Sequence, residues 1–109
     1  MNSENIKLVI YVPLTQADEI RRVLGDTGAG KVRDYDFCSF SSRGVGRFRG
    51  NKKSHPAVGK AGVYESVEEE RIEVLVPRSI LKEVVTKMKA VHPYEDVAYD
   101  IYPVESFDN

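Results

Sequence analysis

The tetrapeptide His92-Pro93-Tyr94-Glu95 carries the residues best suited to chemistry in this sequence. A histidine with a glutamate three residues later offers two ligands to a metal, because imidazole and carboxylate both bind divalent ions. A structural role is favoured over a metal site, since only His55 remains as a further imidazole. A residue before proline disfavours helical backbone, so His92 is expected to end a helix and to bond its last carbonyls. There the helix dipole favours the charged imidazole.

Cys38 is the only cysteine, so an internal disulfide and a cysteine-cluster zinc site are both excluded. Its flanking residues, Phe37 and Phe40, indicate a small core side chain rather than a nucleophile. As a nucleophile it would need His55 or His92 as its base. The sequence therefore assigns no catalytic residue, no bound metal and no cofactor.

A glycine-rich connector, from about Ser41 to Glu68, is the second chemical feature. No Asp or Glu occurs from Phe37 through Tyr64, whereas acid then returns as a run of glutamates. One interpretation is a flexible, solvated β-hairpin, because charge runs are usually solvated faces. The other is an anion site, in which guanidinium forks and backbone N–H groups meet phosphate or carboxylate. The anion prediction is assigned to three arginines: Arg43, Arg47 and Arg49.

The segment from Arg43 to Phe48 is similar to the octamer of the RNA-recognition motif, a domain with the same element order. Val45 and Arg47, however, stand where stacking aromatic rings belong, and each stacked base contributes about 1–3 kcal/mol. Gly44-Val45-Gly46 also lacks the third glycine of a dinucleotide fingerprint and the ending of a P-loop. RNA binding through an aromatic sheet and this basic segment is retained as a second alternative, and nucleic acid is not an expected partner.

Two strand–helix–strand units must hold these residues in place. In the first unit, an apolar strand from Ile6 to Val12 ends at Pro13. Thr15 is the expected N-cap of a helix with Ala17, Ile20, Val23 and Leu24 at helical spacing, and Val32 to Phe40 is the expected second strand.

The second unit repeats this order. A strand from Ile72 to Val76 ends at Pro77, and Ser79 caps a helix whose apolar face includes Val84 and Met88. The last strand runs from Val97 to Tyr102.

An offset of 64 residues aligns the two units without a gap. It matches Val12-Pro13 with Val76-Pro77, and Tyr35-Asp36 with Tyr99-Asp100. This repeat predicts a duplicated βαβ in a ferredoxin-like α+β fold, with two helices on one face of an antiparallel sheet. The other face needs cover, since strand aromatics must reach it; we expect a second copy of the chain there. These aromatics are Tyr11, Tyr35, Phe37, Tyr99 and Tyr102.

Length and net charge limit the number of domains and the kinds of partner. A chain of 109 residues with a net charge of −1 suits one domain, numbered 1–109, and gives no global field toward nucleic acid or an anionic membrane. The N-terminus lacks the pattern of a signal peptide, and the apolar run from Leu8 to Leu14 is too short to cross a bilayer. A cytoplasmic protein with no membrane partner is expected.

Four motifs together resemble the insert domain of the bacterial NGG-interacting-factor family, often labelled GTP cyclohydrolase 1 type 2-like. The motifs are Tyr35 to Ser41, Gly44 to Arg49, Val67 to Glu73 and Ala90 to Pro103. The resemblance implies a PII/CutA-like domain that forms trimers, with the connector in the place of the PII effector loop. The family's dinuclear metal ligands lie outside this insert. Lys52-Lys53-Ser54-His55 is more basic than the family pattern, which leaves a shared ligand open.

The function predicted from these observations is a non-catalytic, self-assembling module that binds a small anion or an acidic protein. Its expected site residues are Arg43, Arg47, Arg49, His92, Tyr94 and Glu95. The main alternative is a metal-binding protein or hydrolase-related enzyme that uses His92 and Glu95, with Asp36 or Cys38 contributed across a subunit boundary.

Overall fold

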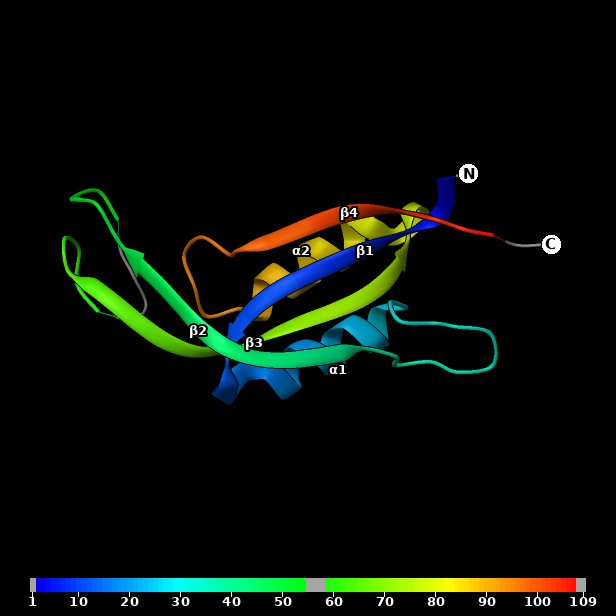
Figure 1. The fold of residues 1–109 in the computed structure, drawn as a ribbon, viewed down its shortest axis with the longest axis horizontal. Coiled ribbons are helices and arrows are strands. Elements are labelled where there is room, and N and C mark those ends of the chain that lie inside the picture. The colour runs from blue at the N-terminus through cyan, green and yellow to red at the C-terminus, as the bar shows by residue number, and fades with distance from the viewer. Residues whose placement is uncertain (1, 55–58, 108–109) are drawn as a thin grey trace.

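Four antiparallel strands form one sheet in the order β2-β3-β1-β4. The computed structural model describes residues 2–54 and 59–107. The strands are β1 (Asn2–Pro13), β2 (Phe40–Arg49), β3 (Tyr64–Pro77) and β4 (Tyr99–Glu105). Two helices, α1 (Ala17–Thr27) and α2 (Leu81–Val91), lie side by side on one face of the sheet (Figure 1). The ferredoxin-like α+β fold predicted from the repeat is therefore confirmed.

Strand β1 lies at the centre of the core because it has a strand on both sides. Its even-numbered residues, such as Leu8 and Ile10, are fully buried against apolar side chains of the helices, including Ile20 and Met88. Each such side chain contributes about 1.5–3 kcal/mol when removed from water. Val9 points to the other face and is nevertheless fully buried there. Much of the core therefore follows from the alternation of one central strand.

The 64-residue repeat expected from the sequence is present in the structure from the first strand of each unit to the end of its helix. The strand ends at Pro13 and Pro77, a short 3-10 turn follows in each case, and the helices begin at Ala17 and Leu81. Residues 17 and 81, and likewise 27 and 91, differ by the predicted 64 positions. Beyond the helices the repeat fails, because Tyr99 begins β4 whereas Tyr35 lies in a loop.

The expected strand over 32–40 is wrong. This segment is a loop with one isolated bridge between Val32 and Tyr35, and β2 begins only at Phe40. Phe37 has a left-handed backbone (φ 56°), which no strand residue adopts. Its ring instead covers Gly25 of α1, where a Cβ would come within 1.9 Å of it. The aromatic residues of this segment favoured a strand in the sequence, but Phe37 packs against α1 instead of pairing in the sheet.

The predicted N-caps are also wrong. Both α-helices follow a 3-10 turn, and neither has a side-chain hydrogen bond at its N-terminus. Thr15 bonds the side chain of Gln16 instead, at 2.9 Å. The proline-led 3-10 turn starts each helix without the cap, since proline presets the backbone φ angle.

The connector is mostly strand, and it forms a projecting arm. Residues 69–77 of β3 pair with β1, but residues 64–68 pair only with residues 45–49 of β2. We call this two-stranded ribbon, residues 45–49 and 64–68, the arm (Figure 1). It lengthens the molecule to 52 × 25 × 24 Å and its radius of gyration to 15.2 Å, against about 13 Å for a compact chain of this length.

The basic and acidic segments of the connector lie on neighbouring strands, β2 and β3. Arg43 pairs in register with Glu70, Gly44 with Glu69 and Val45 with Glu68. The basic window and the acidic run are therefore two strands of one hairpin. His55, named above as a candidate base, lies outside the described residues. None of the helices in the described part of the chain is long and apolar enough to cross a membrane.

Candidate binding site

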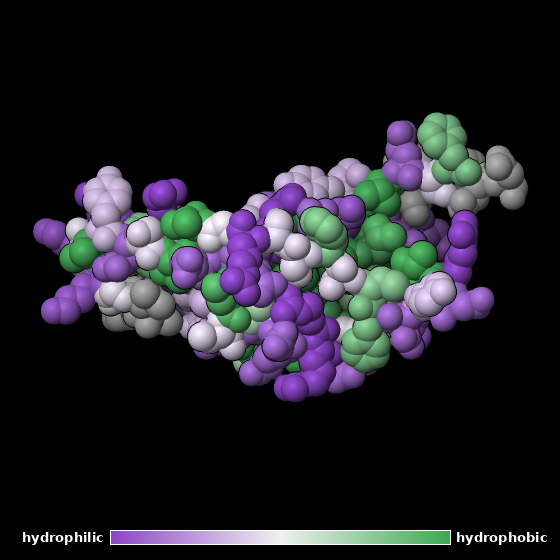
Figure 2. Space-filling view, turned by 60° about the horizontal axis from the view of Figure 1, so that its bottom comes forward, coloured by the Kyte–Doolittle hydropathy of each residue, from purple (hydrophilic) through white to green (hydrophobic). Residues whose placement is uncertain are grey.

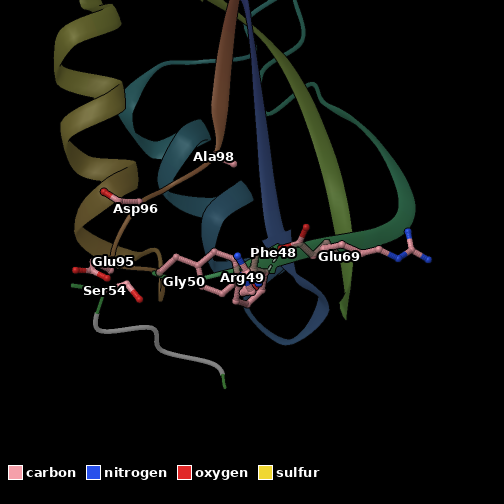
Figure 3. Close-up of a pocket in the computed structure, with 10 residues that line it drawn as sticks. Phe48, Arg49, Gly50, Ser54, Glu69, Glu95, Asp96 and Ala98 are labelled. Carbon is pink, nitrogen blue, oxygen red and sulfur yellow. Dashed lines mark hydrogen bonds between the residues drawn. The ribbon is translucent and has the colours of Figure 1, made fainter. Parts of the chain in front are cut away.

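A pocket of about 270 Å³ opens where the arm meets the loop between α2 and β4. Figure 3 shows Glu95, Asp96 and Ser54 on one side, and Phe48, Arg49 and Glu69 on the other. The pocket brings together segments that lie far apart in the sequence. Its lining comes from the arm and its loop, from β3 and from the loop before β4: Arg47, Phe48, Arg49, Gly50, Ser54, Glu69, Tyr94, Glu95, Asp96 and Ala98.

Four of the six predicted site residues line this pocket: Arg47, Arg49, Tyr94 and Glu95. His92 lies behind Tyr94, with ring centroids 5.1 Å apart. Arg43 is outside the pocket, where β2 runs beside the centre of β3. The tertiary structure thus joins two motifs that the sequence offered separately.

His92 fastens the end of α2 to the sheet. Its Nδ1 accepts the backbone N–H of Tyr94 at 3.1 Å, so the ring proton lies on Nε2. Nε2 then donates to the carbonyl oxygen of Tyr11 in β1 at 2.8 Å. The expectation that the imidazole bonds carbonyls of α2 is wrong, because its carbonyl partner belongs to a strand. With both nitrogens engaged, the ring has no lone pair left for a metal.

His92 is held neutral by its surroundings. The side chain is only 7% exposed, and this burial lowers its pKa, against smaller raising effects from the Tyr11 carbonyl and the Glu69 carboxylate. The expectation that the helix terminus favours the charged imidazole is wrong. Desolvation outweighs the helix dipole here, since protonation would also break the bond from Tyr94 N–H.

Tyr94 and Glu69 form the floor of the pocket. The Tyr94 hydroxyl donates to Oε2 of Glu69 at 2.9 Å. Burial, and then the hydrogen bond to Glu69, raises the pKa of Tyr94, so it stays a donor. Gly46 of β2 permits this arrangement, because a Cβ there would lie 2.0 Å from Oε1 of Glu69.

The two faces of the arm differ in character. Gly46 and Phe48 face the pocket, and the Phe48 ring lies 6.0 Å from that of Tyr94. Side chains alternate along a strand, so Arg47 and Arg49 extend from the opposite face. The Arg49 guanidinium lies 5.0 Å from the centre of the Tyr64 ring. Both arginines line the pocket although they extend from this opposite face, which we call the outer face of the arm, and the Arg49 guanidinium lies on that face against Tyr64.

Nothing in the sequence marks Glu69 as a site residue. It stands in a run of glutamates typical of a solvated face, yet it is 8% exposed. The window without acid in the sequence is also not free of acid in space, since Glu69, Glu95 and Asp96 all line the pocket. Only the pairing of β2 with β3 brings these carboxylates beside the basic strand.

The other candidate groups lie elsewhere. Asp36 and Cys38 belong to the loop after α1, at the end of the molecule opposite to the arm (Figure 1). Cys38 is half-buried and contacts the carbonyl of Asp36 at 3.8 Å. Within the described residues, no three His, Cys, Asp or Glu side chains converge as metal ligands. Within one chain, these groups therefore do not meet His92 and Glu95.

No family model matches the chain. It is 46% identical over 99 residues to a GTP cyclohydrolase 1 type 2 homolog of Bacillus subtilis, and 44% identical over 98 residues to that of Halalkalibacterium halodurans. These matches cover 91% and 90% of the chain but 26% of each relative. The chain thus spans about a quarter of the length of the curated relatives it matches.

Solved structures agree with the sequence comparison. A Bacillus cereus protein related to NIF3 matches with a TM-score of 0.81 and 42% identity, over 97% of this chain and 26% of its own. CutA from Archaeoglobus fulgidus matches at 0.69 and 20% identity, over 94% of this chain and 86% of its own. GlnK of B. subtilis, solved as an ATP complex, matches at 0.61 and 18%, over 94% and 86%. The last two likenesses concern the fold alone.

Proposed function

Since the chain is a homologue of the CutA-like segment of the GTP cyclohydrolase 1 type 2 homologues, we propose that residues 1–109 form one binding and assembly domain. Copies of the chain associate with one another, most simply as a trimer, and the arm takes a small anion or an acidic protein. The cytoplasmic location expected from the sequence belongs to the same proposal.

The observation that carries assembly is that the arm has no third strand beside it. Residues 45–49 and 64–68 pair only with each other, and a two-stranded ribbon is marginal in water without a third strand or a packed face. Val45 and Tyr64 are 50% and 77% exposed on this ribbon. A neighbouring copy would supply the missing contacts.

The surface area of the chain supports the same view. The chain exposes 7605 Å², against about 6,100 Å² for a compact monomer of its mass. The excess, about 1,500 Å², exceeds the roughly 800 Å² that each partner buries in a standard interface. Figure 2 shows apolar side chains at the surface of both the body and the arm, between hydrophilic ones.

The uncovered face of the sheet offers a second contact area. Tyr11 and Tyr102 lie there, on positions that alternate with the core, and Phe40 joins them at 67% exposure. Arg71 lies between them, and the hydrogen bond that its guanidinium donates to the Tyr11 hydroxyl is the largest of the effects that raise its pKa. Of the other aromatic residues expected on this face, Tyr99 packs with the core on the helix side, and Tyr35 and Phe37 are not on strands.

The outer face of the arm supports the anion proposal. Arg43, Arg47 and Arg49 share this face by strand alternation, and none of them makes an ion pair within the described part of the chain. A planar guanidinium fork suits carboxylate or phosphate. Exposed contacts of this kind weaken with salt, since the Debye length is about 8 Å at physiological ionic strength.

A metal-binding or hydrolytic role for His92 and Glu95 fits the geometry less well, because both nitrogens of His92 are already bonded. RNA binding is also less well supported, since the octamer-like segment lies in the edge strand and carries Val45 and Arg47 where rings would stack.

Sedimentation equilibrium tests assembly. The intact chain is expected to be oligomeric at micromolar concentration, and a variant with the arm replaced by a two-residue turn is expected to be monomeric. The matched control is Lys52→Ala/Lys53→Ala, which changes the arm's loop but not its strands. A monomeric intact chain contradicts the assembly proposal.

Thermal shift tests the anion site. Inorganic phosphate and dicarboxylates are expected to raise the Tm of the chain, and the Arg43→Ala/Arg47→Ala/Arg49→Ala variant is expected to lose most of that rise. The Lys52→Ala/Lys53→Ala variant should keep it. Stabilisation retained in full by the arginine variant places the anion elsewhere.

A further inference from the structure

Glu69 is a buried carboxylate without a counter-charge. It is 8% exposed, and its recorded hydrogen bond is the one from the Tyr94 hydroxyl. No Lys, Arg or His of the described residues lies within ion-pair distance of it, and His92 is held neutral. A carboxylate can accept about four hydrogen bonds, and a buried charge without a partner is costly. Glu69 therefore has both unused acceptor capacity and an unbalanced charge, and it lines a pocket.

Two aromatic rings stand beside this carboxylate. The rings of Phe48 and Tyr94 are 6.0 Å apart and inclined by 57°, which gives the pocket two differently oriented aromatic walls. The face of an aromatic ring attracts a cation within about 6 Å of its centre. A carboxylate with two such rings is the combination that holds ammonium and guanidinium groups in proteins.

The carboxylates around the pocket also favour a positively charged ligand. Asp96 lines its far side, and Glu95 lies next to it (Figure 3). Arg47 and Arg49, which border the pocket, extend from the outer face of β2, and the Arg49 guanidinium lies against Tyr64. Three carboxylates, of Glu69, Glu95 and Asp96, thus line the pocket together with two arginines, and one of the two guanidinium groups is already engaged by Tyr64.

The size and donor set distinguish an organic cation from a metal ion. Within the described residues, the carboxylates do not converge closely enough to form a three-ligand metal site. The pocket measures about 270 Å³, many times the roughly 30 Å³ of one water molecule and close to the lower limit of about 300 Å³ for ligand pockets. It has room for a molecule of several non-hydrogen atoms.

We propose that this pocket binds a small organic cation, with an ammonium or guanidinium group on Glu69 and its apolar part against Phe48 and Tyr94. Gly46 and Phe48 face this site, whereas Arg47 and Arg49 extend from the other face of β2 and line the pocket at its border. It goes beyond the proposed function and does not depend on it.

The test is a titration of the ¹⁵N-labelled chain, followed by NMR, with methylguanidinium, putrescine and tetramethylammonium chlorides. Sodium chloride at equal ionic strength and sodium phosphate serve as reference titrations. We expect saturable shifts of the amide signals of Gly46, Phe48 and Tyr94 with at least one organic cation. No saturable shift with any of the three cations overturns the proposal, as does an equal response of these amides to phosphate.

The deciding variant is Glu69→Gln, which keeps an acceptor for the Tyr94 hydroxyl but removes the charge. It is expected to weaken binding at least about tenfold, as loss of a charge-assisted bond does. The matched control is Glu68→Gln, an exposed neighbour whose side chain extends from the other face of β3. This control is expected to stay within about twofold of the parent chain.

A second variant keeps the test decisive if Glu69→Gln does not fold. Phe48→Leu retains apolar volume and is expected to weaken binding about threefold by removing a cation–ring contact. Binding unchanged in every folded variant overturns the proposal. The proposal is also overturned if Ca²⁺ or Mg²⁺ shifts these same amide signals at lower concentration than any organic cation does. The chain could bind an organic cation in the NMR titration and yet show neither anion stabilisation in the thermal shift nor assembly in sedimentation. That result would support this site and contradict the proposed function.

Discussion

The two halves of the chain are built alike up to the end of α1 and α2. The loops that follow these helices differ, and we call them the first exit (after α1) and the second exit (after α2). After α1, Gly28 and Gly30 adopt left-handed backbone with φ of 109° and 80°. The N–H of Gly30 then donates to the carbonyl of Leu75 in β3 at 2.7 Å. After α2, His92 is extended, and its ring donates to the carbonyl of Tyr11 in β1.

Both exits are thus fastened to the sheet by one residue, but by different means. The first uses the backbone of a glycine, which no change of pH alters. The second uses an ionisable side chain, and the loop that it fastens is the one that walls the pocket. The difference shows why only the second loop lines the pocket: it holds polar side chains against the base of the arm, whereas the first loop leads away from it.

The largest effect is expected at the first exit. Gly30→Ala should lower the free energy of unfolding by about 3 kcal/mol, since alanine resists a positive φ. A Cβ at this position would also lie 2.4 Å from the backbone oxygen of Cys38, which cannot move aside easily. Urea denaturation measures the change. Gly44→Ala is the control, because a Cβ there meets nothing within 4 Å; equal losses in both variants would contradict the steric argument.

A smaller loss is expected at the second exit. His92→Ala removes the partner of both the Tyr94 N–H and the Tyr11 carbonyl, and should cost about 2 kcal/mol. The amide signals of residues 94–98 should broaden or shift more than those of the loop after α1. The control Asp96→Ala changes an exposed side chain of the same loop. A His92→Ala variant as stable as this control would show that the imidazole does not fasten the loop.

The pH dependence of stability sharpens the contrast between the exits. The pKa of His92 is lowered by burial, so the unfolded chain binds a proton there more readily than the folded chain does. Stability is therefore complete above about pH 6.5, the ordinary pKa of histidine, and falls as the pH drops below it. Urea midpoints at pH 7.5 and 5.0 measure this loss. The His92→Gln variant should lose less than the parent chain over that range, and an equal loss would assign the dependence to other groups.

The smallest effects are expected where the two halves start their helices alike. Thr15→Ala and Ser79→Ala should each change stability by less than about 0.5 kcal/mol, because neither helix has a side-chain cap. Thermal unfolding of both variants checks this. A loss near 1 kcal/mol in either one, the usual value of an N-cap, would restore the capping role expected from the sequence.

Part of the candidate site could be predicted from the sequence. His92, Tyr94 and Glu95 are set apart by a proline and by the end of an apolar helix, and Arg47 and Arg49 by the absence of nearby acid. That these two groups meet could not be predicted, because the contact depends on how far the ribbon of β2 and β3 extends past β1. Glu69 and Phe48 were missed for the same reason: their burial comes from a loop 25 or more residues away.

The sequence by itself determined the elements whose signals are local. Pro13 and Pro77 end the central strands, and the apolar spacing after each of them specifies a helix, so both helices fall at the predicted offset. Only the tertiary structure decided where β2 begins, that the connector is strand, and which glutamate is buried. A strand is defined by its partner, and a shift of one residue in register exchanges its two faces. The pairing of Gly44 with Glu69 thus placed Glu69 on the same face as Gly46 and Phe48, and the arginines of β2 on the other face.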